Sequence, residues 1–328
     1  MANFEIDTLF DIQSQKEFDS LALKTFKFQY RYNGVYHTFC EHLKRNEDSV
    51  QQVSDIPFLP IQFFKSKKIL TAKKNTEIIF ESSRTTGAIT SKHFIADTTI
   101  YKKSYLNGFK AFYGDVQDYC ILALLPAYLE RKGSSLIYMV DDLIRKSNHP
   151  DSGFYLNNLS ELKIKLEKLE SLGTKTLLIG VSFALLDLVE KYTFSLRHTI
   201  VMETGGMKGR RKEMIRNELH NKLKKGFGVD AIHSEYGMTE LLSQAYSKGR
   251  GIFKSPPWMK ILTRDTENPL EIQQVEKTGG INIIDLANRY SCSFIATQDL
   301  GKTYKDDSFE VLGRFDHSDI RGCNLMAL

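Results

Sequence analysis

Short apolar runs alternate with amphipathic helical segments through most of this 328-residue chain. The predicted strands cover residues 119–126, 135–140, 176–180, 199–202, 229–234, 280–286 and 292–297. The predicted helices cover residues 98–112, 160–172 and 183–192. Because such alternation is typical of strands joined by crossover helices, the sequence predicts an α/β fold with a mostly parallel central sheet and flanking helices.

Composition and charge exclude several classes of protein. The chain is 41% hydrophobic and 26% charged, which is ordinary for a globular protein with a large core. A net charge of +5 allows contact with anionic ligands but does not call for nucleic acid as a partner. No apolar run reaches the roughly 18 residues of a membrane span.

The N-terminus and the cysteines indicate the cellular compartment of the protein. Residues 1–7 lack the basic start and apolar core of a signal peptide. The four cysteines, Cys40, Cys120, Cys292 and Cys323, show no Cys-x-x-Cys spacing, so neither zinc nor a disulfide framework is indicated. We therefore expect a cytoplasmic protein. The first three cysteines lie in predicted helices or strands and should be buried and inert.

A loop rich in hydroxyl side chains directly follows the apolar run at residues 78–80. Hydroxyls, backbone N–H groups and nearby cations in one small volume form the chemistry of a phosphate cradle. The loop is not a Walker motif, which occurs nowhere in the chain. A surface turn rich in Ser and Thr is the alternative. The candidate phosphate-binding residues are Ser82, Ser83, Arg84, Thr85, Thr86 and Gly87.

A glycine-rich loop follows the predicted strand at residues 199–202 and includes Glu203, Thr204, Gly205 and Gly206. Its glycines allow the backbone to approach a ligand closely. A basic helix is predicted after it, with one apolar face. The basic face of that helix is either simply solvated or a surface for an acidic partner or lipid.

Another loop, Tyr236-Gly237-Met238-Thr239-Glu240, follows the predicted strand at residues 229–234. It offers an apolar face for a base, a hydroxyl for an oxyanion and a carboxylate for a hard cation. The segment at residues 180–184 has the pattern Gly-x-Ser-x-Ala, but its fifth residue is Ala and no His or acid can be placed as its partner. A hydrolase nucleophile is therefore not indicated.

Together these motifs resemble the adenylate-forming acyl- and aryl-CoA ligase superfamily, although Arg84 stands where that family's phosphate loop has Gly. The resemblance implies ATP and Mg²⁺ as cofactors. It implies that Tyr236 and residues 203–206 frame adenine, that Thr239 meets phosphate and that Glu240 holds Mg²⁺. It also implies that Asp299, in Gln-Asp-Leu-Gly, and Arg314, in Gly-Arg-Phe-Asp, bind on the ribose side.

Three longer segments, at residues 203–211, 234–244 and 313–325, resemble the acyl-protein synthetases of the bacterial luminescence fatty acid reductase system. This resemblance implies that a fatty acid or other carboxylic acid is activated as an acyl-adenylate and passed to Cys323 as a thioester. It also implies a partner reductase or transferase that receives the acyl group. Arg321 stands beside Cys323 and would lower its pKa. The catalytic residues implied are Cys323, Glu240 and Arg314.

The resemblance also implies the domain plan, which is that of the large N-terminal domain of adenylate-forming enzymes without the usual C-terminal domain. We expect a helical cap at residues 1–75, an α/β core at 76–313 and a short tail at 314–328. Two other functions remain open. One is a phenylacetate-type ligase that uses CoA as the acceptor, and the other is a non-catalytic scaffold that binds acyl groups or nucleotides.

Overall fold

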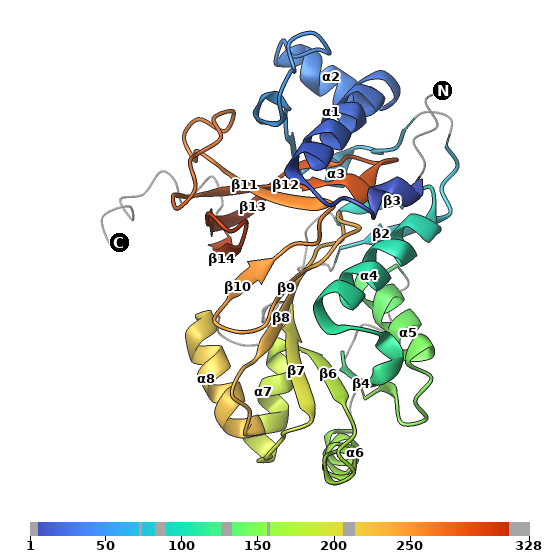
Figure 1. Cartoon of the computed structure of the whole chain (residues 1–328), viewed down its shortest axis with the longest axis vertical. Helices are drawn as coiled ribbons and strands as arrows, with labels where there is room; N and C mark the ends of the chain where they lie inside the picture. The colour runs from blue at the N-terminus through green and yellow to red at the C-terminus, as the bar shows by residue number, and fades with distance from the viewer. Residues whose placement is uncertain are drawn as a thin grey trace. The chain divides into compact units, whose positions relative to one another are not determined.

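The computed structural model describes residues 6–71, 74–82, 90–125, 133–155, 158–205 and 214–314. The chain divides into two compact units (Figure 1). The first unit contains Met1–Ile79, Ser91–Ile100 and Lys254–Leu328, and the second contains Phe80–Thr90 and Tyr101–Phe253. The expected division into cap, core and tail remains a prediction.

The N-terminal part of the first unit is mainly helical, as the sequence predicts. Its helices are η1 (Ile6–Leu9), α1 (Gln15–Tyr32), α2 (Gly34–His42), η2 (Val53–Asp55) and α3 (Phe63–Ser66). Ser14 and Glu17 form a capping box that satisfies backbone N–H groups at the start of α1. Asn33 ends α1 and caps α2 through its side chain, so the two helices meet at one residue.

The strands of the first unit form an antiparallel meander. The strands β11 (Met259–Arg264), β12 (Thr278–Asp285), β13 (Phe294–Thr303) and β14 (Phe309–Arg314) pair in this order, and β1 (Leu59–Pro60) pairs in parallel with β13. The short helix η4 (Leu286–Asn288) follows β12. A separate two-stranded sheet pairs β2 (Ile78–Glu81) with β3 (Lys92–Ile95).

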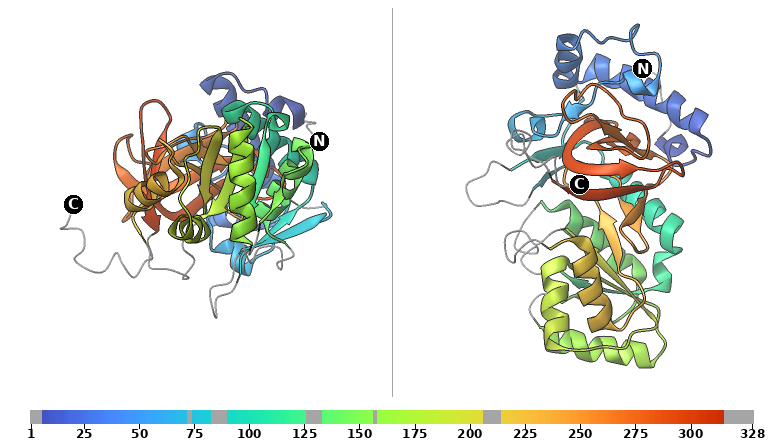
Figure 2. Two further views of the ribbon diagram at one scale, coloured as in Figure 1. Left: turned by 90° about the horizontal axis from the view of Figure 1, so that it is seen from below. Right: turned by 90° about the vertical axis from the view of Figure 1, so that its left-hand side faces the viewer.

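Buried aromatic and amide side chains fix the N-terminal helices to β13. Tyr36 stacks on Phe294 with ring centroids 5.8 Å apart, and Phe26 contacts both rings edge-on. Gln29 donates to the carbonyl of Asn288 at 3.0 Å and accepts from the backbone N–H of Ser293 at 3.0 Å. Figure 2 shows α1 and α2 beside the orange and red strands of this unit. Helices from one end of the sequence thus complete the core around strands from the other.

The second unit contains the parallel sheet that the sequence predicts. Its spatial order is β8-β7-β6-β4-β5, all parallel. These strands are β4 (Cys120–Leu124), β5 (Gly153–Phe154), β6 (Thr176–Val181), β7 (Thr199–Thr204) and β8 (His233–Tyr236). β9 (Ala245–Ser247) pairs antiparallel with β8, and β10 (Ile252–Lys254) lies next to β9. The sheet is therefore mixed, with a parallel majority.

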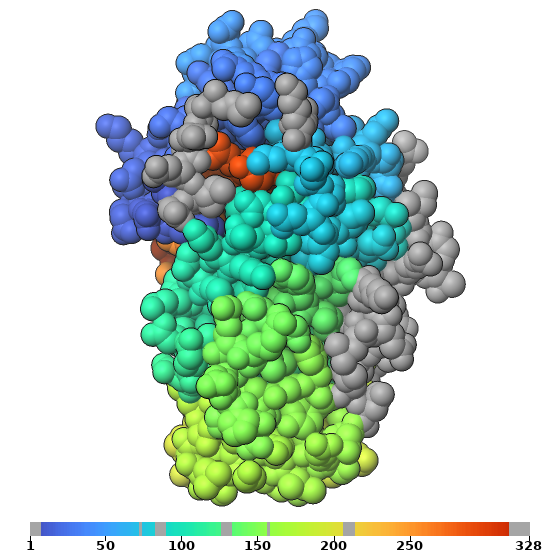
Figure 3. Space-filling model, turned by 90° about the vertical axis from the view of Figure 1, so that its right-hand side faces the viewer, coloured from blue at the N-terminus to red at the C-terminus, as the bar shows by residue number. Residues whose placement is uncertain are grey.

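Helices flank this sheet. They are α4 (Thr98–Tyr113), η3 (Val116–Asp118), α5 (Ser135–Ser147), α6 (Leu159–Ser171), α7 (Ser182–Lys191) and α8 (Arg216–Phe227). Helix α5 packs on β4, and α7 packs on β6 and β7. Every residue of β4 and β6 is buried, which explains their uninterrupted apolar runs. Figure 3 shows the green surface that residues of α5 and α6 form on one side of the unit. The predicted α/β fold class is confirmed.

Three local predictions were wrong. Residues 135–140 are the start of α5 and not a strand. Ser134 caps this helix, and the buried residues Met139, Val140 and Leu143 recur at helical spacing. The strand predicted at 229–234 begins only at His233. Asp299 lies inside β13 and not in a loop after it, because the strand continues to Thr303 through a bulge.

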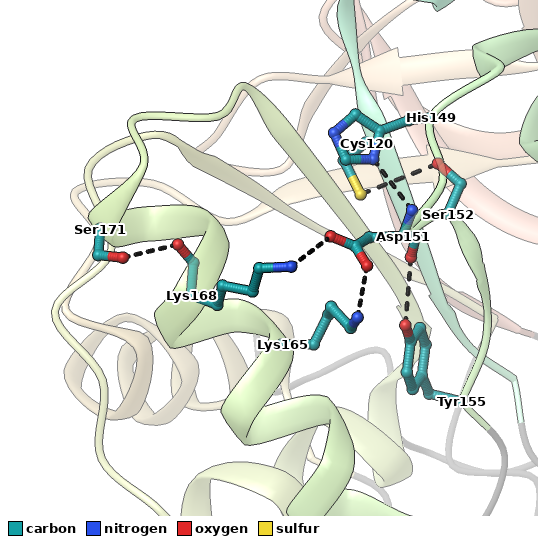
Figure 4. A network of polar contacts seen from close by, with 8 residues as sticks. All are labelled: Cys120, His149, Asp151, Ser152, Tyr155, Lys165, Lys168 and Ser171. Carbon is teal, nitrogen blue, oxygen red and sulfur yellow. Dashed lines mark hydrogen bonds and ion pairs between the residues drawn. The ribbon is translucent and has the colours of Figure 1, made fainter.

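A polar network lies where β4 and β5 begin, at the other end of the strands from the loops discussed below (Figure 4). The Asp151 carboxylate binds Lys165 at 2.5 Å and Lys168 at 3.3 Å, both on α6, and the Lys165 ammonium lowers the pKa of Asp151. The Ser152 hydroxyl accepts from the backbone N–H of Ile121 at 2.8 Å. We assign this network to stability, because it joins α6 and the turn before β5.

In the part of the chain that the structure describes, no helix combines the length and the apolar character that crossing a membrane requires.

Candidate active site

The carboxyl ends of β6, β7 and β8 lie side by side in the second unit. Val181 is in register with Thr204, and Thr204 is in register with Glu235. This register brings the predicted residues of the glycine-rich loop next to those of the Tyr236 loop. Parallel α/β sheets bind their ligands beyond this edge. The adjacent candidates are Glu203, Thr204, Gly205, Tyr236 and Gly237.

A hydrogen bond joins β7 and β8 just before the two loops leave the sheet. The Thr204 hydroxyl donates to Oε2 of Glu235. Gly237 makes room for the same carboxylate, because a Cβ atom at this position would lie 2.4 Å from Oε1 of Glu235. The Tyr236 ring is buried and meets Phe253 edge-on, with centroids 6.0 Å apart. The sequence did not single out Glu235, although it stands in the segment at residues 234–244 and directly precedes the Tyr236 loop.

Glu203 is a buried carboxylate surrounded by polar and basic groups. Ser182, the first residue of α7, lies with its hydroxyl 3.1 Å from Oε2 of Glu203 and 2.8 Å from the carbonyl of Gly205, and can donate to either. On α8, Nε2 of His220 lies 3.5 Å and Nε of Arg216 lies 3.9 Å from Oε1 of Glu203. A carboxylate that is 7% exposed requires such compensation.

Arg216 and His220 were missed as part of this site. The predicted basic helix was assigned either to solvent or to an external partner. Arg216 and His220 are four residues apart and so share one face of α8. That face turns toward Glu203 within the unit, and the Arg216 guanidinium also lies over the Phe253 ring, 5.0 Å from its centroid. The four-residue spacing was the available signal.

Thr239 and Glu240 form a turn after β8, in which the N–H of Leu241 donates to the carbonyl of Met238 at 3.1 Å. Glu240 is 5% exposed. Within the described ranges, no group of three or more His, Cys, Asp and Glu side chains is arranged to hold a metal ion. A single carboxylate still fits Mg²⁺, which usually takes one or two carboxylates and completes its shell with phosphates and water. The metal role of Glu240 remains a prediction.

The Ser/Thr loop is described only at its base. Ser82 belongs to the described residues, whereas Ser83, Arg84, Thr85, Thr86 and Gly87 lie outside them. Gly206 and Cys323 also lie outside them. Just before the loop, the buried Phe80 ring meets Tyr101 at 5.4 Å and Tyr138 at 5.5 Å, both edge-on. The start of the loop is thus anchored in an aromatic cluster of the second unit.

Two predicted residues of the first unit are also brought together. Asp299 on β13 is in register with Arg314 on β14, and Nε of Arg314 lies 3.4 Å from Oδ1 of Asp299. Asp299 is 7% exposed, whereas the Arg314 side chain is 84% exposed. An ion pair with one exposed partner contributes little to stability. The ribose-side role of these two residues remains a prediction.

The three described cysteines are buried. Burial raises the pKa of Cys40 to about 12 and that of Cys120 to about 11, and it also raises the pKa of Cys292. Such thiols form almost no thiolate at neutral pH and are poor nucleophiles. The expectation that these cysteines are buried is confirmed. The acceptor role of Cys323 remains a prediction.

Comparison with known proteins agrees with the resemblance. The family model for "Acyl-protein synthetase, LuxE" matches residues 7–119. A long-chain-fatty-acid–luciferin-component ligase of Vibrio harveyi is 35% identical over a 96-residue alignment, and the match covers 26% of this chain and 25% of that protein. The matched segment thus spans about a quarter of that relative.

Solved structures share the fold at low sequence identity. A 2-hydroxyisobutyryl-CoA ligase, in complex with 2-HIB-AMP and CoA, has a TM-score of 0.65 at 9% identity, covering 93% of this chain and 72% of that one. ATP-bound MatB from Rhodopseudomonas palustris has a TM-score of 0.53 at 16% identity, covering 74% and 50%. The chain therefore has the fold of adenylate-forming enzyme domains.

Proposed function

We propose that this protein uses ATP to activate a fatty acid, or another carboxylic acid, as an acyl-adenylate and then transfers the acyl group to a cysteine thiol. The observation that carries the proposal is the junction of the glycine-rich loop and the Tyr236 loop, joined by the Thr204–Glu235 hydrogen bond. The match to acyl-protein synthetases and the similarity to a fatty acid ligase support the same reaction class.

The reaction proceeds in two displacements. A carboxylate is a poor acyl donor, because its leaving group would be oxide. A carboxylate oxygen attacks the α-phosphorus of ATP, an O–P bond forms, and the bond to pyrophosphate breaks. A thiolate then attacks the acyl carbon, a C–S bond forms, and AMP leaves. Fixed hydrogen-bond donors and positive charge stabilise the phosphate in the first step.

The proposal assigns roles to the candidate residues. The phosphates are bound by Ser82, Ser83, Arg84, Thr85, Thr86, Gly87 and Thr239, and adenine is framed by Tyr236, Gly237 and residues 203–206. The ribose side is assigned to Asp299 and Arg314. ATP is bound in a solved structure with the same fold, which supports ATP as the nucleotide.

Mg²⁺, when bound, would neutralise phosphate charge, and Glu240 would be its carboxylate ligand. Glu203 meets Ser182, His220 and Arg216 within its own unit, so it shapes the adenine site and is not assigned to the metal. Cys323 is the proposed acceptor, since the three described thiols are buried. The thioester would then pass to a partner reductase or transferase.

The fate of the acyl group tests this proposal. The purified chain is incubated with ATP, Mg²⁺ and a radiolabelled long-chain fatty acid, with and without CoA, and protein and soluble products are separated. We expect label on the protein that hydroxylamine releases. Cys323→Ser should lose the label while still exchanging pyrophosphate into ATP. The matched control Cys120→Ala should keep the label, because the Cys120 thiol is buried.

A CoA ligase is the second candidate, favoured by the CoA ligase structure that covers 93% of this chain. Soluble acyl-CoA, together with unchanged activity in Cys323→Ser, would establish this reaction instead. If neither product forms with any acid while the chain binds ATP, the chain is a binding scaffold and both enzymatic proposals are wrong.

A further inference from the structure

The pairing of β12 with β13 is interrupted next to Asp299. Gly280 pairs with Leu300 and Asn282 pairs with Ala296, so Ile281 alone faces residues 297–299 of β13. A bulge of this kind removes ladder hydrogen bonds and re-aims the side chains it carries. Asp299 is the last residue of the bulge, so its direction depends on what holds the bulge in place.

A buried arginine occupies this gap. Arg264, the last residue of β11, is 7% exposed. Its Nη1 donates to the carbonyl of Ile281 at 2.8 Å, and its Nη2 donates to the carbonyl of Thr297 at 2.6 Å. The two nitrogens of one rigid guanidinium thus bridge the strands where the regular ladder is broken.

The same group of bonds reaches the backbone of Asp299. The Thr297 hydroxyl donates to the carbonyl of Ile281 at 2.9 Å and accepts from the backbone N–H of Asp299 at 3.1 Å. Arg264 therefore binds the backbone carbonyls of Ile281 and Thr297, and the hydrogen bonds of Thr297 reach the backbone of Asp299. Its Nη1 also lies 2.8 Å from Oδ1 of Asn282, which fixes the plane of the guanidinium.

Two glycines leave the space for this arginine. Arg264 is in register with Gly280, where a Cβ atom would lie only 2.6 Å from Cζ of Arg264. At Gly279, a Cβ atom would lie 2.3 Å from the carbonyl oxygen of Arg264. Any larger residue at either position would push the β11 strand or its guanidinium out of place. The place of the Arg264 side chain in the sheet therefore depends on the Gly-Gly pair of β12.

Charge links Arg264 to Asp299 as well. Burial lowers the pKa of Arg264 to about 10, and the nearby Asp299 carboxylate opposes this shift, so the guanidinium stays charged at neutral pH. A buried cation is costly unless an opposite charge compensates it. Asp299 provides that charge, and its Oδ1 also lies 3.4 Å from Nε of the exposed Arg314.

We infer that Arg264 is a positioning residue that bridges the β13 bulge and thereby fixes the Asp299 carboxylate for binding the ribose hydroxyls of the nucleotide. The inference rests on the proposed role of Asp299. It adds a residue that the motifs do not contain and that does not itself touch the ligand. It predicts that Arg264 governs discrimination between ribonucleotides and nucleotides without ribose hydroxyls.

The test compares dissociation constants for ATP and for 2′,3′-dideoxyATP, measured with the full chain in the presence of Mg²⁺. The ratio of the two dissociation constants, measured within one variant, does not depend on the fraction of protein that is folded. Loss of one charge-assisted hydrogen bond changes affinity by about tenfold, so wild type should prefer ATP by about tenfold or more.

Arg264→Lys is the main variant, because lysine keeps the charge and much of the stem but cannot form the two-nitrogen bridge. It should bring the ratio close to one by weakening ATP binding, with dideoxyATP binding nearly unchanged. Asp299→Ala should do the same. Arg289→Lys is the matched control in the same unit, since the Arg289 guanidinium lies over the Phe28 ring, 4.9 Å from its centroid, and it should keep the wild-type ratio.

If Asp299→Ala loses the preference and Arg264→Lys keeps it, the inference about Arg264 is overturned and the ribose role of Asp299 stands. If wild type shows no preference for ATP, or Asp299→Ala retains it, the proposed ribose role is itself wrong and the inference fails with it.

Discussion

Three carboxylates matter to the site proposed in the second unit. Glu203 is buried and Glu235 is partly buried, and each is held by groups of its own unit. Glu240 is buried, follows in a turn and is assigned to the metal. We expect Glu240→Gln to lower the rate of Mg²⁺-dependent pyrophosphate exchange on the order of tenfold to a hundredfold, while ATP affinity changes much less. The amide keeps the shape but removes the charge that a hard cation needs.

Exchange kinetics and equilibrium ATP binding, measured on the same preparations, check this prediction. Glu218→Gln is the control, because Glu218 is an exposed residue of α8 that pairs with Lys222. Wild-type exchange in Glu240→Gln would remove the metal role from this residue.

A histidine at the start of β8 gives the fold a pH dependence. Burial lowers the pKa of His233 to about 4, with Lys248 contributing, and the Tyr113 hydroxyl lies 3.1 Å from its Nδ1. The unfolded chain takes up a proton near pH 6.5, but the folded chain does not until about pH 4. Stability is therefore fully present above pH 6.5 and falls as the pH drops through this window.

From pH 7.5 to pH 5 this one group should remove about 2 kcal/mol of unfolding free energy. His233→Asn keeps a hydrogen-bond acceptor near Tyr113 but cannot take up the proton. Between the two pH values, its free energy of unfolding should therefore fall by about 2 kcal/mol less than that of the wild type. Urea unfolding at the two pH values, followed by circular dichroism, measures the difference. Equal declines in both proteins would show that His233 is not the cause.

At the scale of helices and strands, the sequence correctly predicts the secondary structure of long periodic segments. The prediction fails where a short apolar run is compatible with both a helix and a strand. Neither the length nor the flanks of the apolar run in α5 distinguish a buried strand from a helix. The helix is indicated only when the N-cap at Ser134 is considered together with the helical spacing that continues to Leu143. Asp299 was placed after its strand because a bulge leaves no simple sequence pattern. Arg216 and His220 were missed because their partner, Glu203, is distant in sequence.

Helix packing supplies a prediction at this scale. Gly226 lies inside α8, where replacing Gly by Ala usually stabilises a helix by about 1 kcal/mol. Here a Cβ atom would lie 2.3 Å from Cβ of Val189 on α7, which cannot move without the helix. We therefore expect Gly226→Ala to destabilise the protein by about 1 to 3 kcal/mol.

Gly34→Ala is the matched control, because nothing lies within 4 Å of its added Cβ at the start of α2. It should leave stability unchanged or raise it slightly. Midpoints of thermal unfolding compare the two, and a higher midpoint for Gly226→Ala would contradict the close approach of α7 and α8.

At the scale of the whole molecule, the sequence predicts the fold class because strand and helix patterns repeat along the chain. It does not predict the composition of the units. The first unit combines α1 and α2 with strands more than two hundred residues later, through contacts such as Tyr36 with Phe294. No local pattern records such a pairing. Residues 83–87 of the Ser/Thr loop and the proposed acceptor Cys323 lie outside the described residues, so their proposed roles rest on the chemistry of their side chains.

The most direct measurement of the central claim is the exchange of labelled pyrophosphate into ATP by the purified full chain. Reversible adenylate formation requires the acid, ATP and Mg²⁺ together, but no thiol acceptor. We predict exchange that depends on an added fatty acid, needs Mg²⁺ and proceeds without CoA. Absence of exchange with every fatty acid tested, in protein that binds ATP, would contradict the claim that this chain forms acyl-adenylates.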